Sequence, residues 1–234
     1  MADDPVLLIT GASSGIGAAT ARAAASKYRL VLAARREQQL QDLAEELGGG
    51  GRAIAVRCDV TEWDEVQALA ATALERFGRI DAVFANAGFG ATRGFLEESP
   101  EHWRSMVLTN VYGVALTIRA TLPHLLERGD GHFLVTSSIA GRVALPGSLY
   151  SATKWAATAI GESLRAELRQ MHDNQGIKVT LIEPGMVDTP FFDNRPGEWA
   201  LKDEDIARTV MFALEQPAGV DVNEILVRPT TQPI

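Results

Sequence analysis

Tyr150 and Lys154 are the side chains in this sequence whose types and spacing best suit acid–base chemistry. Residues four apart on a helix share one face, so the lysine ammonium group would lie beside the phenol and stabilise its anion. An unperturbed phenol has a pKa of about 10, and a neighbouring cation lowers it. The phenol would then donate and accept protons at a useful pH. Taken alone, the pair is better explained by an amphipathic helix with a half-buried aromatic ring and a solvated amine.

Two adjacent serines offer a second polar group for such a reaction. Ser137 and Ser138 end the apolar run that begins at Phe133, and Ser138 precedes Tyr150 by twelve residues. A serine hydroxyl at a strand terminus can donate a hydrogen bond to a substrate oxygen and polarise it. Because neighbouring strand residues point to opposite faces of a sheet, only one of the two serines can enter the site.

The chain that must position these groups alternates short apolar runs with longer helical patterns. This alternation predicts a single α/β domain, a Rossmann-type doubly wound sheet of seven parallel strands with helices on both faces. The expected strands are Val6–Thr10, Arg29–Ala34, Arg52–Arg57, Ala82–Asn86, Gly131–Ser138, Lys178–Glu183 and Glu224–Val227. The expected helices are Gly15–Ser26, Glu37–Leu47, Trp63–Phe77, Pro100–Glu127, Tyr150–His172 and Asp203–Leu214, and residues 48–51 are expected to form a flexible connector.

The composition is typical of one globular domain. Of the 234 residues, 46% are hydrophobic and 22% are charged, and the net charge is −8. The acidic balance and the lack of a basic run or a membrane-spanning apolar run argue against nucleic acid and membranes as partners. The polar amino terminus does not resemble a signal peptide, and the single cysteine, Cys58, forms no intramolecular disulfide and suggests no metal site. We therefore expect a cytoplasmic protein with no bound metal.

A glycine-rich turn follows the first expected strand. The segment from Thr10 to Gly17 has glycines at positions 11, 15 and 17 and leads directly into an alanine-rich helix. Glycines permit a tight turn, and a helix amino terminus offers unpaired N–H groups to a phosphate. The turn is therefore a candidate pyrophosphate site, although its Gly-x-x-x-Gly-x-Gly spacing differs from the commoner Gly-x-Gly-x-x-Gly fingerprint. The alternative is a glycine turn that only joins a strand to a helix.

Several motifs follow one another in the order that one known family has. They are the turn 10–17, Asp59-Val60, Asn86-Ala-Gly88, Asn110, Ser138, Tyr150-x-x-x-Lys154 and Pro184-Gly185. Through them, nearly the whole chain resembles the compact, single-domain branch of the short-chain dehydrogenases/reductases. The resemblance implies catalytic roles for Asn110, Ser138, Tyr150 and Lys154, and it selects Ser138 over Ser137. Asn110 would support a water near Lys154 that relays protons; alternatively, it satisfies a helix kink.

The resemblance also implies a reaction. Hydride moves between the nicotinamide of the cofactor and a carbinol carbon, and Tyr150 exchanges the alcohol proton separately. Lys154 and the positively charged oxidised nicotinamide would stabilise the phenolate, and Lys154 would also hold the nicotinamide ribose. Ser138, Tyr150 and Phe191 would contact the substrate.

The end of the second expected strand indicates which cofactor is used. An acidic residue there would bind the adenine ribose 2′-hydroxyl, whereas a basic one would accept a 2′-phosphate. No carboxylate occupies this position, and Arg35 and Arg36 follow it. We therefore predict NADP(H), with Arg35 as the main phosphate ligand and Arg36 or Ser14 assisting. The alternative is that the arginines are solvated and pair with Glu37 or Glu45.

The remaining cofactor contacts also come from the resemblance. Asp59 would contact the adenine amino group while Val60 covers the ring; alternatively, Asp59 caps the helix that starts near Thr61. The other residues belong to the turns after the first, fourth and sixth strands and to the catalytic pair: Gly11, Ser13, Ser14, Gly15, Ile16, Gly17, Asn86, Ala87, Gly88, Pro184, Gly185, Val187, Thr189, Tyr150 and Lys154. For residues 86–88 the alternative is a turn that simply ends a strand.

The segment between Pro184 and the last helix is the expected substrate region. Its aromatic residues suggest a partly apolar lid over a small or medium carbonyl compound, and the alternative is a hydrophobic loop packed on the core. The lid residues are Phe191, Phe192, Pro196 and Trp199, with Phe89, Leu145 and Met186 as candidate walls. Arg195 either binds a substrate carboxylate or is exposed to solvent.

The carboxyl-terminal residues 215–232 resemble those of NADP-dependent 3-hydroxy acid and serine dehydrogenases, although the lid is shorter than in the hydroxy acid enzymes. Two other functions are compatible with the same motifs: a nucleotide-sugar epimerase or dehydratase, and a non-catalytic NADP-sensing regulator. The family resemblance implies a homo-oligomer, a tetramer with a dimer as the alternative, that packs through the helices bearing Asn110 and Tyr150.

Overall fold

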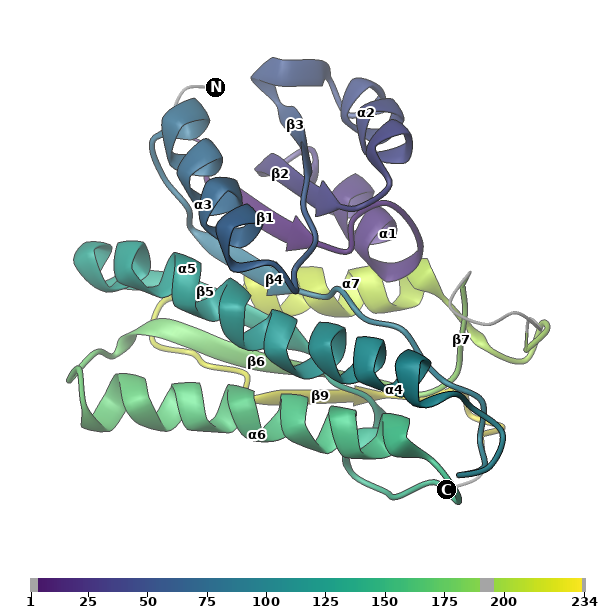
Figure 1. Cartoon of the computed structure of the whole chain (residues 1–234). Helices are drawn as coiled ribbons and strands as arrows, with labels where there is room; N and C mark the ends of the chain where they lie inside the picture. The colour runs from purple at the N-terminus through teal and green to yellow at the C-terminus, as the bar shows by residue number, and fades with distance from the viewer. Residues whose placement is uncertain (1–3, 190–195, 233–234) are drawn as a thin grey trace.

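Seven short, apolar segments form a parallel sheet at the centre of the protein (Figure 1). The computed structural model describes residues 4–189 and 196–232. Its strands are β1 Val6–Thr10, β2 Arg29–Ala34, β3 Ala53–Arg57, β4 Ala82–Ala85, β5 Asp130–Thr136, β6 Gly176–Pro184 and β9 Glu224–Val227. They lie in the order β3-β2-β1-β4-β5-β6-β9, and every neighbouring pair is parallel. The predicted seven-stranded, doubly wound sheet is confirmed.

Helices cover both faces of the sheet and enclose two apolar layers (Figure 1). One face carries α1 Gly15–Ala24, α2 Glu37–Glu46 and α7 Asp203–Leu214. The other face carries α3 Trp63–Phe77, α5 Gly113–Arg128 and α6 Leu149–Gln170.

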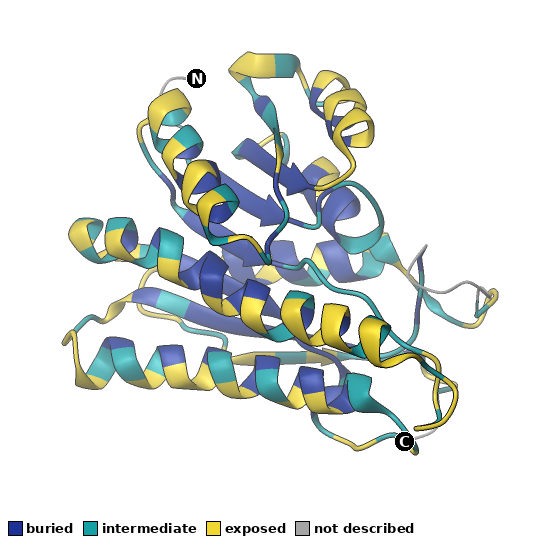
Figure 2. Cartoon of the chain, viewed as in Figure 1, coloured by how far each residue is buried: buried dark blue, intermediate teal, exposed yellow. Residues whose placement is uncertain are grey.

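Strand side chains alternate between these two layers. In β1, Val6 and Leu8 belong to the layer beneath α3, α5 and α6, whereas Leu7 and Ile9 belong to the opposite layer. The sheet is therefore buried on both faces, as Figure 2 shows for its centre. This double burial is why the strands appear in the sequence as continuous apolar runs rather than as alternating ones.

The structure differs from the predicted elements in four places. The predicted helix Pro100–Glu127 is divided into α4 Pro100–Val107, a π-helical turn Leu108–Tyr112 and α5. A small parallel pair, β7 Val187–Asp188 with β8 Leu201–Lys202, lies outside the main sheet. The glycine connector contains a 3-10 turn, Gly49–Gly51, and a second such turn, Ile139–Gly141, follows β5. The other predicted boundaries agree to within two residues.

The sheet reverses its winding direction at β1, which lies between β2 and β4. In open α/β sheets, ligands bind outside the carboxyl ends of the strands at such a reversal. No helix in residues 4–189 or 196–232 is long and apolar enough to cross a membrane. The same residues contain no group of three or more His, Cys, Asp or Glu side chains that could hold a metal ion.

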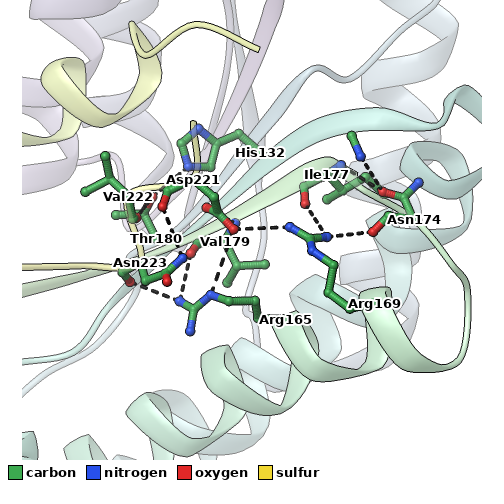
Figure 3. A network of polar contacts seen from close by, with 11 residues as sticks. His132, Arg165, Arg169, Asn174, Ile177, Val179, Thr180, Asp221, Val222 and Asn223 are labelled. Carbon is green, nitrogen blue, oxygen red and sulfur yellow. Dashed lines mark hydrogen bonds and ion pairs between the residues drawn. The ribbon is translucent and has the colours of Figure 1, made fainter. Parts of the chain in front are cut away.

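A network of polar contacts surrounds the amino ends of β5 and β6, at the edge of the sheet opposite the carboxyl ends of the strands (Figure 3). Arg165 of α6 donates hydrogen bonds to the carbonyl oxygens of Val179 and Asn223, at 2.8 and 3.0 Å. Arg169, one helical turn further on, pairs with Asp221 at 3.2 Å. These arginines attach α6 to β6 and to the segment that leads into β9.

His132 of β5 is buried beside this network as a neutral ring. Its Nε2 atom lies 2.8 Å from Thr180 Oγ1, and the Thr180 hydroxyl donates to the carbonyl oxygen of Val222 at 2.6 Å. Because that hydroxyl has a single proton, Nε2 must be the donor and Nδ1 carries no proton. In the part of the chain described, Nδ1 has no hydrogen-bond partner. Burial, together with the charge of Lys178, lowers the pKa of His132 to about 3.

We predict that His132 makes the folded state less stable in mild acid. The unfolded chain binds a proton at its ordinary pKa of 6.5, but the folded protein does so only near 3. Between these values the unfolded state holds more protons, so the free energy of unfolding falls as the pH falls, by about 1.4 kcal/mol per pH unit from this group. In urea unfolding followed by circular dichroism, His132→Gln should show a shallower decline than wild type below pH 6.5. Equal declines in both proteins would contradict the assignment.

Candidate active site

Tyr150 and Lys154 lie on the first turns of α6, where the carboxyl ends of β5 and β6 meet that helix. The Lys154 Nζ atom is 5.7 Å from the centroid of the Tyr150 ring, so the two side chains share one face of the helix. Nζ also donates a hydrogen bond to the carbonyl oxygen of Thr136, the last residue of β5, at 2.8 Å. The end of β5 therefore anchors the ammonium group beside the phenol.

The two serines after β5 have different partners. Ser137 Oγ donates to the backbone oxygen of Lys154 at 3.1 Å and lies 2.7 Å from Thr158 Oγ1, so it is directed to the body of α6. The Ser138 hydroxyl forms a hydrogen bond with Tyr150 and also lies 3.3 Å from the carbonyl oxygen of Pro184. The structure thus brings Ser138, and not Ser137, to the phenol.

Asn110 lies in the π-helical turn between α4 and α5 and is buried. Its side chain accepts a hydrogen bond from the Phe89 N–H at 3.0 Å and donates to the Phe89 carbonyl at 2.9 Å. It also donates to Thr153 Oγ1 on α6 at 3.1 Å. A Cβ on Gly88 would lie 3.0 Å from Asn110 Oδ1 and 3.7 Å from Lys154 Nζ. The helix irregularity considered above is therefore present, and its asparagine fixes the loop after β4 beside Lys154.

Burial controls the ionisation of the pair. Burial raises the pKa of Tyr150 well above its ordinary value, although the Ser138 hydrogen bond acts in the opposite direction. Burial also lowers the pKa of Lys154 to about 8. In the protein alone, burial is the largest influence on the phenol, and it works against the phenolate. The positively charged oxidised nicotinamide, named above together with Lys154, would favour the phenolate.

The turn after β1 exposes bare backbone at the start of α1. Gly11 and Gly15 have φ angles of +69° and +53°, which glycine adopts readily. A Cβ on Gly17 would lie 2.4 Å from the Gly11 carbonyl oxygen, so α1 packs directly against the turn. The helix has no side-chain cap and no acidic residue in its first turn, which leaves its N–H groups and dipole for an anion. These features fit a phosphate group.

Asn86 connects the ends of three neighbouring strands beside this turn. Its Nδ2 donates to the Thr10 carbonyl at 3.2 Å, and its Oδ1 accepts from Thr136 Oγ1 at 3.0 Å. Thr10 Oγ1 in turn accepts from the N–H groups of Asn86 and Ala87, at 3.0 and 3.2 Å. The phosphate turn, the loop after β4 and the end of β5 are thereby held in fixed relation.

Arg36, rather than Arg35, lies against the phosphate turn. Its Nη2 atom donates to Ser13 Oγ at 2.9 Å and to Ser14 Oγ at 2.5 Å. The Arg35 guanidinium is 3.8 Å from Asp59, and its side chain is 64% exposed. We predicted Arg35 as the main phosphate ligand, but Arg36 is the arginine that contacts the two serines of the turn.

Asp59 and Val60 are both engaged in local structure after β3. Asp59 Oδ1 accepts hydrogen bonds from the N–H and the hydroxyl of Thr61, at 3.0 and 2.9 Å, which forms a local turn before α3. It does not cap that helix, which begins at Trp63 with Glu62 as its N-cap residue. Its side chain remains 25% exposed. Val60 is buried against α5, since a Cβ on Gly113 would lie 2.6 Å from Val60 Cγ2.

The carboxyl-terminal segment holds the turn after β6. Gly185 donates from its N–H to the Val227 carbonyl at 2.7 Å, and Met186 donates to Gln232 Oε1 at 2.8 Å. A Cβ on Gly185 would lie 2.3 Å from the same Gln232 oxygen. Sequence reasoning did not assign a role to Gln232, because nothing in the linear order indicates that the chain end returns to this turn.

Beyond this turn, Val187 is buried and pairs with Leu201 in the small β7–β8 pair. Thr189 reaches back to the phosphate turn, since a Cβ on Gly15 would lie 3.3 Å from its side chain. Phe191, proposed to contact the substrate, lies outside the described residues, as do Phe192 and Arg195.

Among the candidate wall residues, Phe89 packs edge-on against His102 with ring centroids 5.2 Å apart. Leu145 donates from its N–H to Ser151 Oγ at 3.1 Å. The loops that carry them are joined directly, because Gly94 donates from its N–H to the Gly147 carbonyl at 2.8 Å.

Sequence reasoning also missed Thr136, Thr153 and the ion pair of Arg142 with Glu183, whose nitrogen and oxygen atoms are 2.8 Å apart. Glu183, a charged residue at the end of an apolar strand, indicated that a partner is needed, but the identity of that partner depends on the folded topology.

A parallel sheet wound in this order, with an uncapped helix at a glycine turn on its carboxyl side, defines a Rossmann-type α/β protein. Residues 5–198 match the family model described as short chain dehydrogenase. A relative from Listeria innocua, an uncharacterized oxidoreductase, is 37% identical over 243 residues that cover 97% of each chain. The chain belongs to the short chain dehydrogenase family and is an oxidoreductase.

Solved structures agree with this membership. An alcohol dehydrogenase from the archaeon Thermococcus sibiricus, complexed with 5-hydroxy-NADP, is 34% identical with a TM-score of 0.87 and covers 99% of each chain. The closed form of a serine dehydrogenase complexed with NADP+ is 29% identical with a TM-score of 0.91, over 98% of this chain and 96% of that one. A short chain dehydrogenase/reductase from Burkholderia phymatum in complex with NAD is 30% identical with a TM-score of 0.85, over 96% and 89%.

Proposed function

We propose that this protein is an NADP(H)-dependent oxidoreductase that interconverts a carbonyl compound and a secondary alcohol. The observation that carries the proposal is the convergence of Ser138, Tyr150 and Lys154 at the end of β5, beside a phosphate-binding turn. The alcohol dehydrogenase and serine dehydrogenase structures, both with NADP-type ligands, support this reaction class. The substrate is a ketone, an aldehyde or a 3-hydroxy acid.

In this mechanism each side chain has a separate task. The nicotinamide, when bound, supplies or accepts the hydride. Ser138 donates a hydrogen bond to the substrate oxygen, and Tyr150 holds the proton that this oxygen gains or loses. Lys154 lies beside the phenol and holds the nicotinamide ribose. Asn110 orders the loop after β4 and supports a water near Lys154.

The proposed cofactor preference rests on positive charge at the phosphate turn. Arg36, Ser13 and Ser14 form a cluster that suits a ribose 2′-phosphate, and Arg35 stands nearby on the solvent side. Because a related structure holds NAD, the preference for NADP(H) depends on these residues of this chain and not on the family.

One prediction from this function concerns Tyr150→Phe. Loss of the phenolic oxygen removes the proton donor, so kcat for carbonyl reduction should fall at least about 100-fold. The cofactor dissociation constant, measured by fluorescence, should hardly change. Tyr28→Phe, which removes a phenol elsewhere, is the matched control and should keep its activity.

The same assay, a panel of ketones, 3-hydroxy acids and secondary alcohols followed by cofactor absorbance, separates the alternatives. Tight NADP binding with no turnover of any substrate would favour the sensing regulator, and redox-neutral conversion of a nucleotide sugar would favour the epimerase. Retained turnover in Tyr150→Phe would refute the mechanism.

A second prediction concerns cofactor preference. Arg36→Ala should lower the ratio of kcat/KM for NADPH over NADH by about 10- to 100-fold, as expected for the loss of hydrogen bonds to a charged group. Arg35→Ala should have a smaller effect, because its guanidinium lies near Asp59, whereas that of Arg36 contacts the two serines of the turn. Arg57→Ala is the control, since this exposed arginine pairs with Glu65. An unchanged ratio in both the Arg35 and Arg36 variants would rule out the site.

We further propose a cytoplasmic homo-oligomer, a tetramer with a dimer as the alternative. Tyr112 and Trp155, on the helices that bear Asn110 and Tyr150, are 47% and 49% exposed, which suits an interface between copies. Cys58 is buried, and burial raises the pKa of its thiol to about 12, so it is unreactive and compatible with a reducing compartment.

Sedimentation analysis tests the assembly. Wild type should sediment as a tetramer, and Trp155→Glu should shift it to smaller species because a charge would be buried in the interface. Met171→Glu, at an exposed position beyond α6, should leave the assembly unchanged. A monomeric wild type would refute the proposal.

A further inference from the structure

An ion pair with one buried partner lies next to the turn that follows Ser138, the serine that the proposed mechanism uses. Arg142 comes at the end of the 3-10 turn that begins after Ser138, and its Nε donates to Glu183 at 2.8 Å. Glu183 is 1% exposed and immediately precedes Pro184 at the end of β6. A carboxylate at this depth requires a charged or hydrogen-bonding partner. Arg142 also pairs with Glu224 of β9, so it joins the serine turn to two strands.

The segments joined by this pair are the ones that surround the Ser138 hydroxyl. Ser138 has one proton and two acceptors within reach, the Pro184 carbonyl at 3.3 Å and the Tyr150 oxygen. The distance between the serine turn and the end of β6 therefore decides how the proton is shared between them. Displacement of Pro184 by a fraction of a hydrogen-bond length would change that sharing.

The other side of the serine turn is already fixed to α6. A Cβ on Gly141 would lie 2.5 Å from Ser137 Oγ and 2.8 Å from the Lys154 carbonyl oxygen, so the turn cannot approach the helix more closely. Ser137 itself donates to that carbonyl. The turn after Ser138 is therefore packed closely against α6 on one side and is joined to β6 and β9 by ion pairs on the other.

We propose that Arg142 is a positioning residue for the reaction: by holding Glu183, it sets the place of the Pro184 carbonyl relative to Ser138 and so directs the serine hydroxyl to Tyr150 and the substrate oxygen. This inference rests on the function proposed above. With the pair intact, Ser138 can turn from Pro184 to its reacting partner without movement of the backbone. Without it, the serine turn and the end of β6 move independently.

The arginine network at the other end of the same strands provides a matched control (Figure 3). Arg169 and Asp221 also link α6 with β6 and with the segment before β9. They lie at the amino end of β6, whereas Glu183 lies at its carboxyl end. Neutralising them should loosen the same strands without touching the serine turn.

The experiment compares two double variants and one conservative variant in the full-length protein. Arg142→Gln with Glu183→Gln removes the pair without leaving a charge buried alone, which protects folding. Arg169→Gln with Asp221→Asn is the control. The conservative variant, Arg142→Lys, keeps the positive charge beside Glu183. Each is assayed for kcat, KM and the cofactor dissociation constant. The hydrogen bond at Tyr150 is read separately, by carbon NMR of tyrosine labelled at Cζ and assigned with Tyr150→Phe.

The neutralised Arg142 pair should lower kcat about 10- to 100-fold, as a small misplacement of a reacting group does, with the cofactor dissociation constant unchanged. Its Tyr150 Cζ resonance should move in the same direction as in Ser138→Ala. Arg142→Lys should show smaller changes in kcat and in the Cζ resonance than the neutralised pair does. The variant with Arg169 and Asp221 neutralised should lower only the unfolding midpoint.

Two results would overturn the inference: a wild-type kcat and Cζ resonance in the neutralised Arg142 pair, or equal changes in the Arg169 pair, which would indicate general loosening. If wild type turned over no substrate while the Cζ resonance still responded to Arg142, the proposed function would fail and the link from Arg142 to Ser138 would stand. If wild type showed normal turnover and neither the Cζ resonance nor kcat changed in the neutralised Arg142 pair, the link from Arg142 to Ser138 would fail and the proposed function would stand.

Discussion

A single buried ammonium group, that of Lys154, is the charge around which the site is arranged. It is 4% exposed, and burial lowers its pKa to about 8. An ammonium has three N–H donors, and burial is costly unless they find acceptors. The end of β5 offers one acceptor through Thr136, while the missing side chain of Gly88 leaves room beside Nζ. In the function proposed above, its other N–H groups would bind the ribose hydroxyls and a water.

Much of the fold could be predicted because local signals and tertiary burial agree. The run Val6–Thr10 is apolar at nearly every position because both faces of the sheet are covered, and Gly78, with φ of +73°, ends α3 where the sequence indicated. Part of the site could be predicted for a similar reason. A helix alone fixes the spacing of Tyr150 and Lys154, and a strand end fixes Ser138.

The remaining features depend on contacts between distant segments. Whether Arg35 or Arg36 meets the phosphate turn depends on how α2 leaves β2, which a run of two identical residues does not reveal. Gln232 reaches Met186 only because β9 places the chain end beside β6. The pairing of Arg142 with Glu183 likewise requires the turn after β5 to lie next to the end of β6. The spacing of residues along the sequence does not predict such contacts between distant segments.

The π-helical turn at Asn110 sets the rotational offset between α4 and α5 in the helical segment from Pro100 to Arg128. Met106 and Val114, on either side of the turn, are both buried. In an unbroken α-helix, eight residues of separation would put them about 80° apart around the axis, but the extra residue of the π turn reduces this to about 20°. Loss of one residue between them would let the segment form an unbroken α-helix, in which seven residues of separation give the same offset of about 20°. The π turn therefore accommodates the residue that carries the Asn110 position while the apolar sides of α4 and α5 stay aligned.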